Sequence, residues 1–355
     1  MKNIFIVSHS GKIEGAADYF EDYLIRAGNI VVKLSHPLDA YAGNFTVLSQ
    51  NRKEIKKWKR FNFSLLNLIL DFISSIFYTL KYSFDTYIGA NNFDVLPAIV
   101  ARKIFRKKIR KIIYFASDFS ENRFASSLLN KIYYFVEKIS IKHADLIISN
   151  TFRAESRRLS LGLDRSKSLV VPNGVHLDNP VFDRKDLNKN NFIFVGSVTK
   201  ESGLFDLLEV LKPKIDKFVL IGDGDDWNRV IGYLTENIKD AEIYHKKGHD
   251  FVLDKLRNFC GFGLAPYNTG RGYIYFGSSL KINEYLACGL PIITTDVLEI
   301  APSIKNKKLG IVWDGINHAD LLKEVDAFDT TAFEEKAKEF YSEYSHDNLY
   351  SRIAL

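Results

Sequence analysis

The sequence predicts an α/β protein made of two tandem doubly wound domains that face a cleft, and three observations carry this prediction. The chain has 355 residues, enough for about two domains of ~150–180 residues each. Short, continuous apolar runs alternate with helical patterns, which is typical of parallel sheets covered on both faces. These runs form two series, and the polar, turn-rich stretch 172–191 separates them.

The expected strands follow in chain order. The first series comprises 3–8, 30–34, 86–89, 111–116, 145–149 and 168–171, and the second comprises 192–196, 218–222, 241–244, 262–266, 291–295 and 309–313. We therefore expect domains over 1–172 and 191–334, joined by a linker over 173–190. A charged amphipathic helix over 335–355 follows, and we expect it to pack back on the first domain.

Composition indicates an ordinary globular protein, with 46% hydrophobic and 26% charged residues. Cys260 and Cys288 lack the spacing of a disulfide or a metal site, which fits a reducing cytoplasm. The N-terminal run is too short and polar-flanked for a signal peptide. The most apolar stretch, 61–80, is interrupted by Asp71, so we expect no membrane-spanning helix.

Positive charge gathers in two blocks, 52–60 and 101–111, while the net charge of +6 is too mild to indicate a nucleic-acid partner. An apolar stripe at helical spacing follows the first block, formed by Leu65, Ile69, Phe72, Ile76 and Leu80. A basic amphipathic helix here could lie on an anionic membrane surface. The alternative is a core-facing helix with a solvated basic end.

Neither domain carries the G-x-G-x-x-G dinucleotide fingerprint after its first strand, and the P-loop pattern is absent as well, which counts against an NAD enzyme. The first domain has Gly11 and Gly15 at this place, and the second has a turn bracketed by Gly196 and Gly203. A strand-to-helix turn of this kind either receives phosphate at its backbone N–H groups or is purely structural.

The stretch FGSSLKINEYLACGLPIITTD, residues 276–296, predicts a short helix that Ser278 or Ser279 caps and Gly289 ends. Lys281 lies in the first helical turn, where the helix dipole disfavours a cation unless an anion is present. A diphosphate held by Lys281 and the backbone amides of Gly277, Ser278 and Ser279 would supply that anion. Glu284, on the same face, suits the hydroxyls of a ribose, and the alternative is an ordinary surface Lys/Glu pair.

Four strings in this order resemble the motifs of the GT-B-fold glycosyltransferase superfamily: VVPNGVH, FVGSVTKESGLFDLL, LIGDGDDW and SLKINEYLACGLPIITT. The resemblance covers most of the chain and is nearest in style to membrane-associated bacterial polysaccharide enzymes. It implies a hexosyltransferase that moves a sugar from a nucleotide-diphosphate-sugar, of UDP or GDP type, to a lipid-linked or polysaccharide acceptor. It also implies a peripheral location on the inner face of the cell membrane.

The departures from the family pattern concern the donor site. Phe276 stands where many retaining relatives have a glutamate, which makes a retaining outcome less certain. Ser197 and Ser202 replace a basic pair, so Lys200 and Lys281 would supply the phosphate-binding charge. The resemblance implies that Gly248 and His249 meet the nucleobase.

The resemblance also implies an acceptor site in the first domain, with Asp118 as the general base of an inverting transfer. His9 is the rival base, and Gly11, Asn91 and Asn92 are acceptor-binding candidates. A helix cap at Asp118 and a structural His9 are the alternatives.

The Asp223-Gly224-Asp225 sequence reads as a strand-end turn, so we expect no metal and no cofactor. Two other functions compete with this prediction. One is a GT-B sugar-nucleotide epimerase or hydrolase, and the other is a non-catalytic nucleotide-binding relative.

Overall fold

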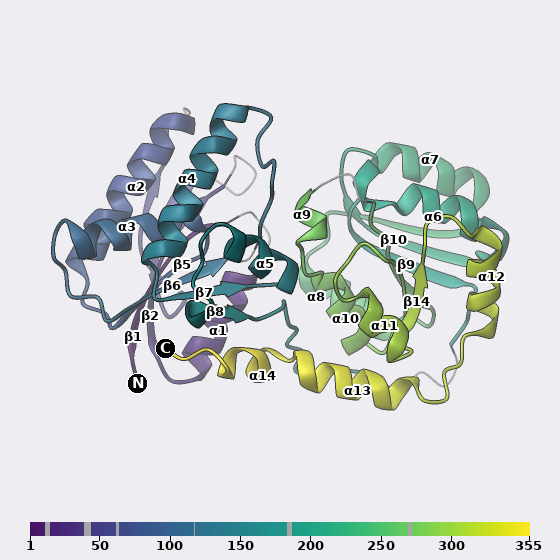
Figure 1. The fold of residues 1–355 in the computed structure, drawn as a ribbon. Coiled ribbons are helices and arrows are strands. Elements are labelled where there is room, and N and C mark those ends of the chain that lie inside the picture. Colours follow the sequence, from purple (N-terminus) through teal and green to yellow (C-terminus); the bar gives the residue numbers. More distant parts are fainter. Residues whose placement is uncertain (11–14, 39–43, 62–63, 117, 183–186, 269–271) are drawn as a thin grey trace. The chain divides into compact units, whose positions relative to one another are not determined.

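The computed structural model describes residues 1–355 except 11–14, 39–43, 62–63, 117, 183–186 and 269–271 (Figure 1). The chain divides into two compact units, residues 1–172 with 349–355 and residues 173–348. Each unit is a mixed α/β layer structure around a largely parallel sheet, which confirms the predicted fold class. Residues 173–190, expected as a separate linker, belong to the second unit.

The first unit is built on an eight-stranded sheet with the order β4-β3-β2-β1-β5-β6-β7-β8. Its parallel strands are β1 (Asn3–Ser10), β2 (Ile30–Pro37), β5 (Thr86–Gly89), β6 (Lys111–Ala116), β7 (Leu146–Ser149) and β8 (Ser168–Val170). Two antiparallel strands, β3 (Phe45–Gln50) and β4 (Lys53–Lys59), extend this sheet beyond β2.

The sequence analysis missed this hairpin, and it corrects the reading of the basic block 52–60 as the lead-in to an amphipathic helix. The block forms the edge strand β4, and most of its side chains are exposed. Lysines on an exposed edge strand discourage pairing with other strands, which accounts for this concentration of charge without a ligand. In the second block, Arg102 pairs with Asp145 and the Lys107 ammonium donates to the Leu80 and Tyr82 carbonyls.

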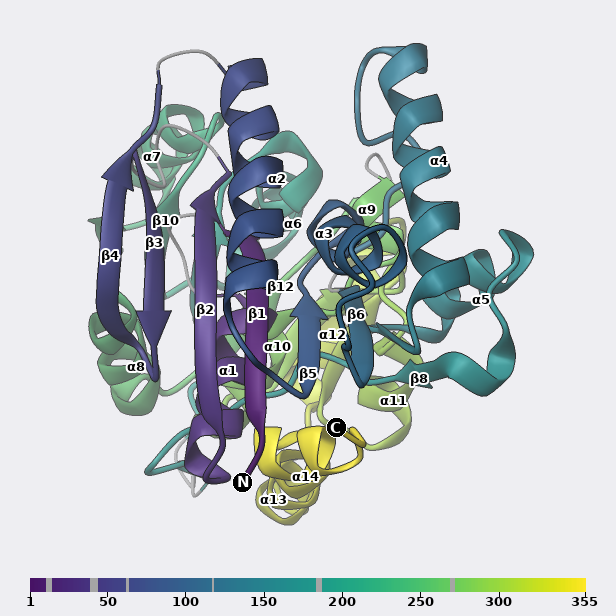
Figure 2. The ribbon, with the colours of Figure 1, turned by 90° about the vertical axis from the view of Figure 1, so that its left-hand side faces the viewer.

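Helices cover both faces of the first sheet (Figure 2). One core contains residues of α2 (Ser64–Lys81), α3 (Asn92–Lys103) and α4 (Ser127–His143). The opposite core contains residues of α1 (Ala16–Arg26) together with Leu349, Tyr350 and Ile353 from the C-terminus. Helix α5 (Phe152–Ser160) connects β7 to β8. Among the helices that fall within the described ranges, none is long and apolar enough to cross a membrane.

The second unit has a six-stranded, fully parallel sheet with the order β11-β10-β9-β12-β13-β14. Its strands are β9 (Asn191–Ser197), β10 (Lys217–Asp223), β11 (Asp240–His245), β12 (Phe262–Ala265), β13 (Ile292–Thr295) and β14 (Gly310–Trp313). Helices α6 (Leu204–Leu211), α7 (Trp227–Asn237) and α12 (His318–Ala327) pack on one face. The other face holds α8 (His249–Asn258), α10 (Leu280–Ala287) and α11 (Ala301–Asn306).

The single helix expected over 335–355 is two helices, α13 (Phe333–Tyr344) and α14 (His346–Ser351). Extended backbone at Ser345 ends α13. Phe333, Ala337 and Phe340 belong to the core of the second unit, so only residues 349–355 pack on the first. The expectation for the whole segment is therefore wrong for its longer part.

Candidate functional site

In each unit, polar side chains gather where the parallel strands end at a switch in strand order. In the second unit, β9 lies between β10 and β12, and in the first unit β1 lies between β2 and β5. Such switch points open a crevice at the carboxyl edge of a doubly wound sheet, where ligands bind.

The Lys281 side chain lies beside Gly196 at the end of β9. A methyl group on Gly196 would come within 3.2 Å of Lys281 Nζ, and the φ of Gly196 is +127°, so only glycine fits here. The ammonium lies 4.3 Å from the centre of the Phe194 ring and 5.4 Å from that of Tyr267. Lys281 and Gly196, two of the predicted donor-site residues, are thus in contact.

The Lys281 side chain is partly buried. No hydrogen bond or ion pair joins its ammonium to another residue in the part of the chain that the structure describes. Burial lowers the pKa of Lys281 to about 8, although the Glu284 carboxylate acts against this shift. A half-buried cation that the described residues contact through aromatic faces can therefore gain strongly from an anionic ligand.

Glu284 and His249 form a pair. Glu284 Oε1 lies 2.9 Å from His249 Nε2, and His249 is the first residue of α8, after the N-cap Gly248. Glu284, which is expected to bind the ribose, and His249, which is expected to meet the nucleobase, are therefore neighbours.

The loop before α10 is tied down by Asn173, from the P-N-G sequence. The Asn173 N–H donates to Ser278 Oγ at 3.1 Å, and its side-chain amide donates to the Ser278 carbonyl at 2.6 Å. Ser279 Oγ lies 2.7 Å from the Tyr267 hydroxyl. The Gly277 N–H already donates to the Ile274 carbonyl, so it is not available to a phosphate as expected.

The glycine-bracketed turn after β9 exposes Ser197 and Lys200. The Lys200 carbonyl accepts from the Asn268 side chain, which holds the short helical turn Lys200–Ser202. The neighbouring Asp223 ends β10, and its carbonyl accepts from the Val198 N–H at 2.6 Å. Within the described ranges, no group of three or more His, Cys, Asp or Glu side chains could hold a metal ion.

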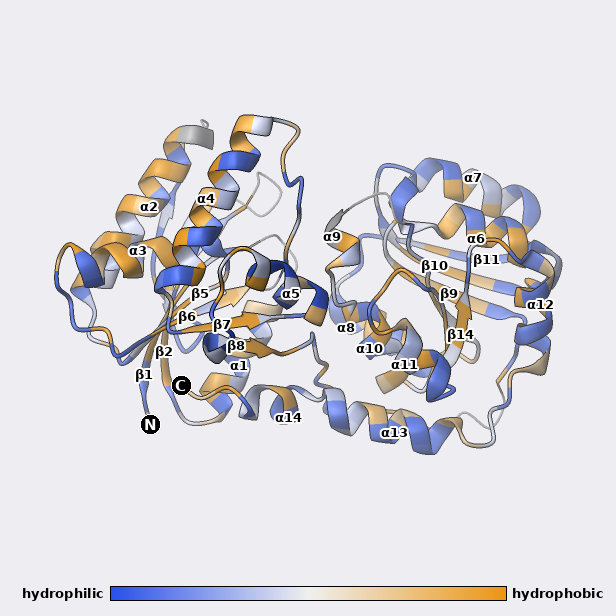
Figure 3. Cartoon of the chain, in the orientation of Figure 1, coloured by the Kyte–Doolittle hydropathy of each residue, from blue (hydrophilic) through white to orange (hydrophobic). Residues whose placement is uncertain are grey.

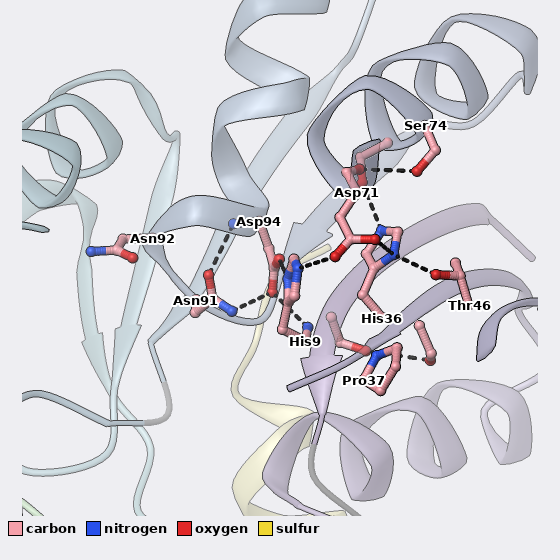
Figure 4. Close-up of polar contacts among 12 residues, drawn as sticks. His9, His36, Pro37, Thr46, Asp71, Ser74, Asn91, Asn92 and Asp94 are labelled. Carbon is pink, nitrogen blue, oxygen red and sulfur yellow. Dashed lines mark hydrogen bonds and ion pairs between the residues drawn. The ribbon is translucent and has the colours of Figure 1, made fainter. Parts of the chain in front are cut away.

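In the first unit, His9 at the end of β1 lies in a cluster of ionisable groups (Figure 4). His9 Nδ1 is 2.5 Å from Asp94 Oδ1, and His9 Nε2 is 3.5 Å from Asp71 Oδ2. Asp71 Oδ1 is also 3.1 Å from His36 Nδ1, and Arg60 donates to the same carboxylate. The ends of β1 and β2 and the helices α2 and α3 supply the histidines and aspartates, and Arg60 follows β4.

The two carboxylates decide the charge of His9. Burial lowers its pKa, but the Asp94 and Asp71 carboxylates outweigh burial and raise the pKa to about 9. Burial, together with the positive charge of His9, lowers the pKa of His36 despite Asp71. His9 is therefore an imidazolium at neutral pH while His36 is neutral.

We expect stability to depend on this charge. The folded pKa of His9 exceeds its usual value of about 6.5, so its contribution is complete below about pH 6.5 and is lost as the pH rises through about 9. Between these two pH values, the free energy of unfolding measured in urea should fall by roughly 3 kcal/mol more in the wild type than in His9→Gln. The lowered pKa of Lys281 makes stability rise with pH in both proteins, so this effect cancels when the two pH profiles are compared. Equal pH profiles for the two proteins would contradict the assignment.

Asp118 lies beyond the end of β6, with about half of its side chain exposed. Its carboxylate is 3.3 Å from Arg123 Nη1, and its carbonyl accepts from Arg158 Nη2 at 3.0 Å. Arg158 is fully buried and pairs with Glu137 at 2.8 Å. Helix α4 begins only at Ser127, with Ser126 as its cap, so Asp118 is not the helix cap of the alternative reading.

The acceptor-binding candidates have separate outcomes. Asn91 caps α3 and its side-chain amide donates to Asp94 Oδ2 at 2.6 Å, so it helps to orient the partner of His9. Asn92 points away from this cluster, toward the Tyr133 carbonyl of α4 (Figure 4). Asn92 therefore does not join the His9 cluster, and its role in acceptor binding stays a prediction. Gly11 lies outside the described residues.

Sequence reasoning missed Asp71, Asp94 and His36 around His9, and Asn173 and Asn283 around α10. The Asn283 side chain donates to the Asn173 carbonyl at 2.6 Å. Asp94 could have been found from its place three residues after Asn91, the spacing of a helix cap. Asp71 carried no such signal, because it interrupts an apolar run.

Comparison with known proteins gives a consistent result. Residues 229–353 match the family described as "Glucosyltransferase 3-like, C-terminal domain". A 41.2 kDa protein in the cps region of Klebsiella pneumoniae is 27% identical over 345 residues, which cover 90% of this chain and 87% of the relative. An uncharacterised glycosyltransferase of Methanocaldococcus jannaschii is 24% identical over 162 residues, 45% of this chain and 43% of that protein.

Two solved structures show the likeness of fold. The apo form of the lipopolysaccharide outer core galactosyltransferase WaaB has a TM-score of 0.70 at 15% identity, covering 99% of this chain and 97% of its own. HepE from Anabaena, in complex with UDP-glucose, has a TM-score of 0.65 at 14% identity, covering 97% and 95%. Both carry the GT-B fold that the sequence motifs predict.

Proposed function

We propose that this chain, a GT-B-fold glycosyltransferase of the polysaccharide type, transfers a hexose from a UDP-sugar to a lipid-linked or polysaccharide acceptor at the inner face of the cell membrane. The observation that carries the proposal is the ammonium of Lys281, which lies beside Gly196 at the switch point of the second sheet and has no hydrogen-bond or ion-pair partner among the described residues. A bound diphosphate would give this ammonium a negatively charged partner.

The donor assignment has further support from the surroundings of Lys281. Glu284, one turn along α10, offers a carboxylate to ribose hydroxyls, and Gly248 and His249 at the start of α8 lie next to it. Uridine is our choice of base because HepE is described in complex with UDP-glucose and UDP. Lys200, exposed on the turn after β9, is a second cation for the phosphates.

For the transfer itself we propose that Asp118 is the general base. Its carboxylate takes the proton of the acceptor hydroxyl as that oxygen bonds to the anomeric carbon. The bond between the anomeric carbon and the β-phosphate oxygen breaks, and its electron pair leaves with UDP, whose growing charge Lys281 stabilises. This single displacement inverts the anomeric configuration.

The charge of His9 favours Asp118 over His9 as the base. An imidazolium has no lone pair with which to accept a proton, and the flanking carboxylates keep His9 in this form up to about pH 9. The His9 imidazolium is better suited to binding a negatively charged part of the acceptor.

Donor binding and turnover test the function. UDP should raise the melting temperature more than GDP, because we propose that the site prefers uridine. A ligand at 100 times its Kd stabilises the folded protein by ~2.7 kcal/mol, which a melting curve can detect. UDP-hexose should be consumed only when membranes that contain the acceptor are added. Turnover in acceptor-free, membrane-free buffer would indicate an epimerase or hydrolase, and binding without turnover on any acceptor would indicate a non-catalytic relative.

We expect transfer to survive a chelator. Lys281 and the backbone amides near α10 would neutralise the leaving diphosphate without a divalent cation. Rates measured after EDTA treatment should match untreated enzyme, with Mg²⁺ re-addition as the control. Loss of transfer in EDTA and its recovery with Mg²⁺ or Mn²⁺ would contradict a metal-free mechanism.

A further inference from the structure

Helix α2 buries four of its polar side chains and leaves several of its large apolar side chains exposed. The residues buried against the rest of the unit are Asn67, Asp71, Ser75, Tyr78 and Thr79, which follow one another at helical spacing. The exposed face carries Leu66, Leu68, Ile69, Leu70, Ile73 and Phe77, each 37% to 56% exposed. A helix of a water-soluble surface shows the opposite arrangement.

The buried polar face has partners that explain why it points inward. Asp71 meets His9, His36 and Arg60, and Ser75 Oγ lies 3.0 Å from His36 Nε2. Asn67 exchanges two hydrogen bonds with the backbone of Phe61. These contacts fix the rotation of α2, so its apolar face cannot turn toward the core without leaving buried polar groups unpaired.

Helix α4 adds a second exposed apolar face on the same side of the sheet. Leu128, Leu129, Ile132 and Phe135 are 46% to 65% exposed. Helix α3 packs against both α2 and α4 and joins them in one layer (Figures 2 and 3). We call the exposed apolar residues of α2 and α4 the apolar face of the first unit.

The exposed charged residues of α2 and α4 have one sign. The acidic residues of these two helices, Asp71 and Glu137, are both buried. The exposed charged residues are the lysines Lys81, Lys131, Lys138 and Lys142. Apolar side chains set among lysines, without an exposed carboxylate on either helix, complement a surface of anionic lipids.

We propose that the apolar face inserts into the headgroup region of an anionic lipid bilayer, with the lysines of α4 and the end of α2 contacting lipid phosphates. This deepens the proposed function, because it names the surface that would bring the chain to a membrane-held acceptor. Because apolar side chains insert, part of the binding should persist at high salt. The edge strand β4 is not required.

Vesicle flotation without donor tests the proposal independently of sugar transfer. The probe is vesicles of equal parts phosphatidylcholine and phosphatidylglycerol, compared with pure phosphatidylcholine. We expect Ile73→Gln/Phe77→Gln and Leu128→Gln/Phe135→Gln each to weaken binding at least tenfold, at low salt and at about 1 M salt, where exposed charges are screened within about 3 Å. Lys131→Gln/Lys138→Gln should weaken binding to anionic vesicles at low salt only.

The matched control is Ile316→Gln, which removes a 77% exposed isoleucine from the second unit. It should bind as wild type, and circular dichroism should show that all variants are folded. Unchanged flotation of both glutamine pairs would overturn the proposal, as would flotation abolished by salt alone. A wild-type dimer in sedimentation, which the same glutamine pairs dissociate without any vesicle binding, would assign the face to a second copy instead. Sugar transfer to an acceptor without vesicle binding would overturn this inference and leave the proposed glycosyltransferase activity standing.

Discussion

Lys281→Ala should weaken UDP binding about 10- to 150-fold, because a charge-assisted hydrogen bond contributes roughly 1.5–3 kcal/mol. The ammonium has no hydrogen-bonding partner in the described part of the unliganded protein, so its removal costs the free protein little. The loss should therefore appear in binding and not in unfolding. Calorimetric titration with UDP, next to urea unfolding of both proteins, measures the two quantities.

The same site should make binding dependent on pH. The pKa of Lys281 is lowered to about 8, and a bound diphosphate favours the charged form, so binding raises this pKa and takes up protons near pH 8. Affinity should fall as the pH rises past 8 in the wild type but stay level in Lys281→Arg, whose charge persists. Proton uptake is measured by calorimetry in buffers with different ionisation heats. UDP affinity that Lys281→Ala leaves unchanged would remove the assignment.

Glu284→Ala should weaken UDP binding within the same range as Lys281→Ala. Its carboxylate now pairs with His249, so the variant loses both the ribose acceptor and the partner that positions His249. His249→Ala separates the two effects, because it leaves the Glu284 carboxylate in place. Equal loss in the two variants would indicate that the pair acts through His249.

Asp118→Asn should lower kcat by about 10²–10⁴-fold, the usual contribution of a general base. The amide has nearly the shape of the carboxylate but cannot accept the proton of the acceptor hydroxyl. UDP affinity should hardly change, because the proposed donor site belongs to the other unit. Steady-state rates with saturating donor, together with UDP titration, separate these two effects.

Arg123→Gln is the matched control for Asp118→Asn. It removes the ion pair at 3.3 Å but leaves the carboxylate in place, so it should keep most of the activity. A silent Asp118→Asn together with an inactive His9→Ala would move the base to the His9 cluster. NMR of a product that keeps the anomeric configuration of the donor would exclude the single displacement altogether.

Local patterns in the sequence were sufficient for the α/β class and for the placement of Lys281 and Glu284 on one helix, α10. Apolar runs between helical patterns predict parallel strands because both faces of such strands are buried. A three-residue spacing places Lys281 and Glu284 on one helical face, whatever the helix packs against. The helix dipole disfavours a lysine in the first turn of a helix, so the local sequence also predicts a bound anion there.

Only the tertiary structure decided the surroundings of His9 and the orientation of α2. Asp71 and Asp94 come from helices distant in sequence, and the charge of His9 depends on their convergence at the carboxyl edge of the sheet. The sequence period of residues 64–81 shows which side chains share a face but not which face points inward. That choice depends on hydrogen-bond partners from β1, β2 and the segment before α2, because an unpaired buried carboxylate costs more than several exposed leucines.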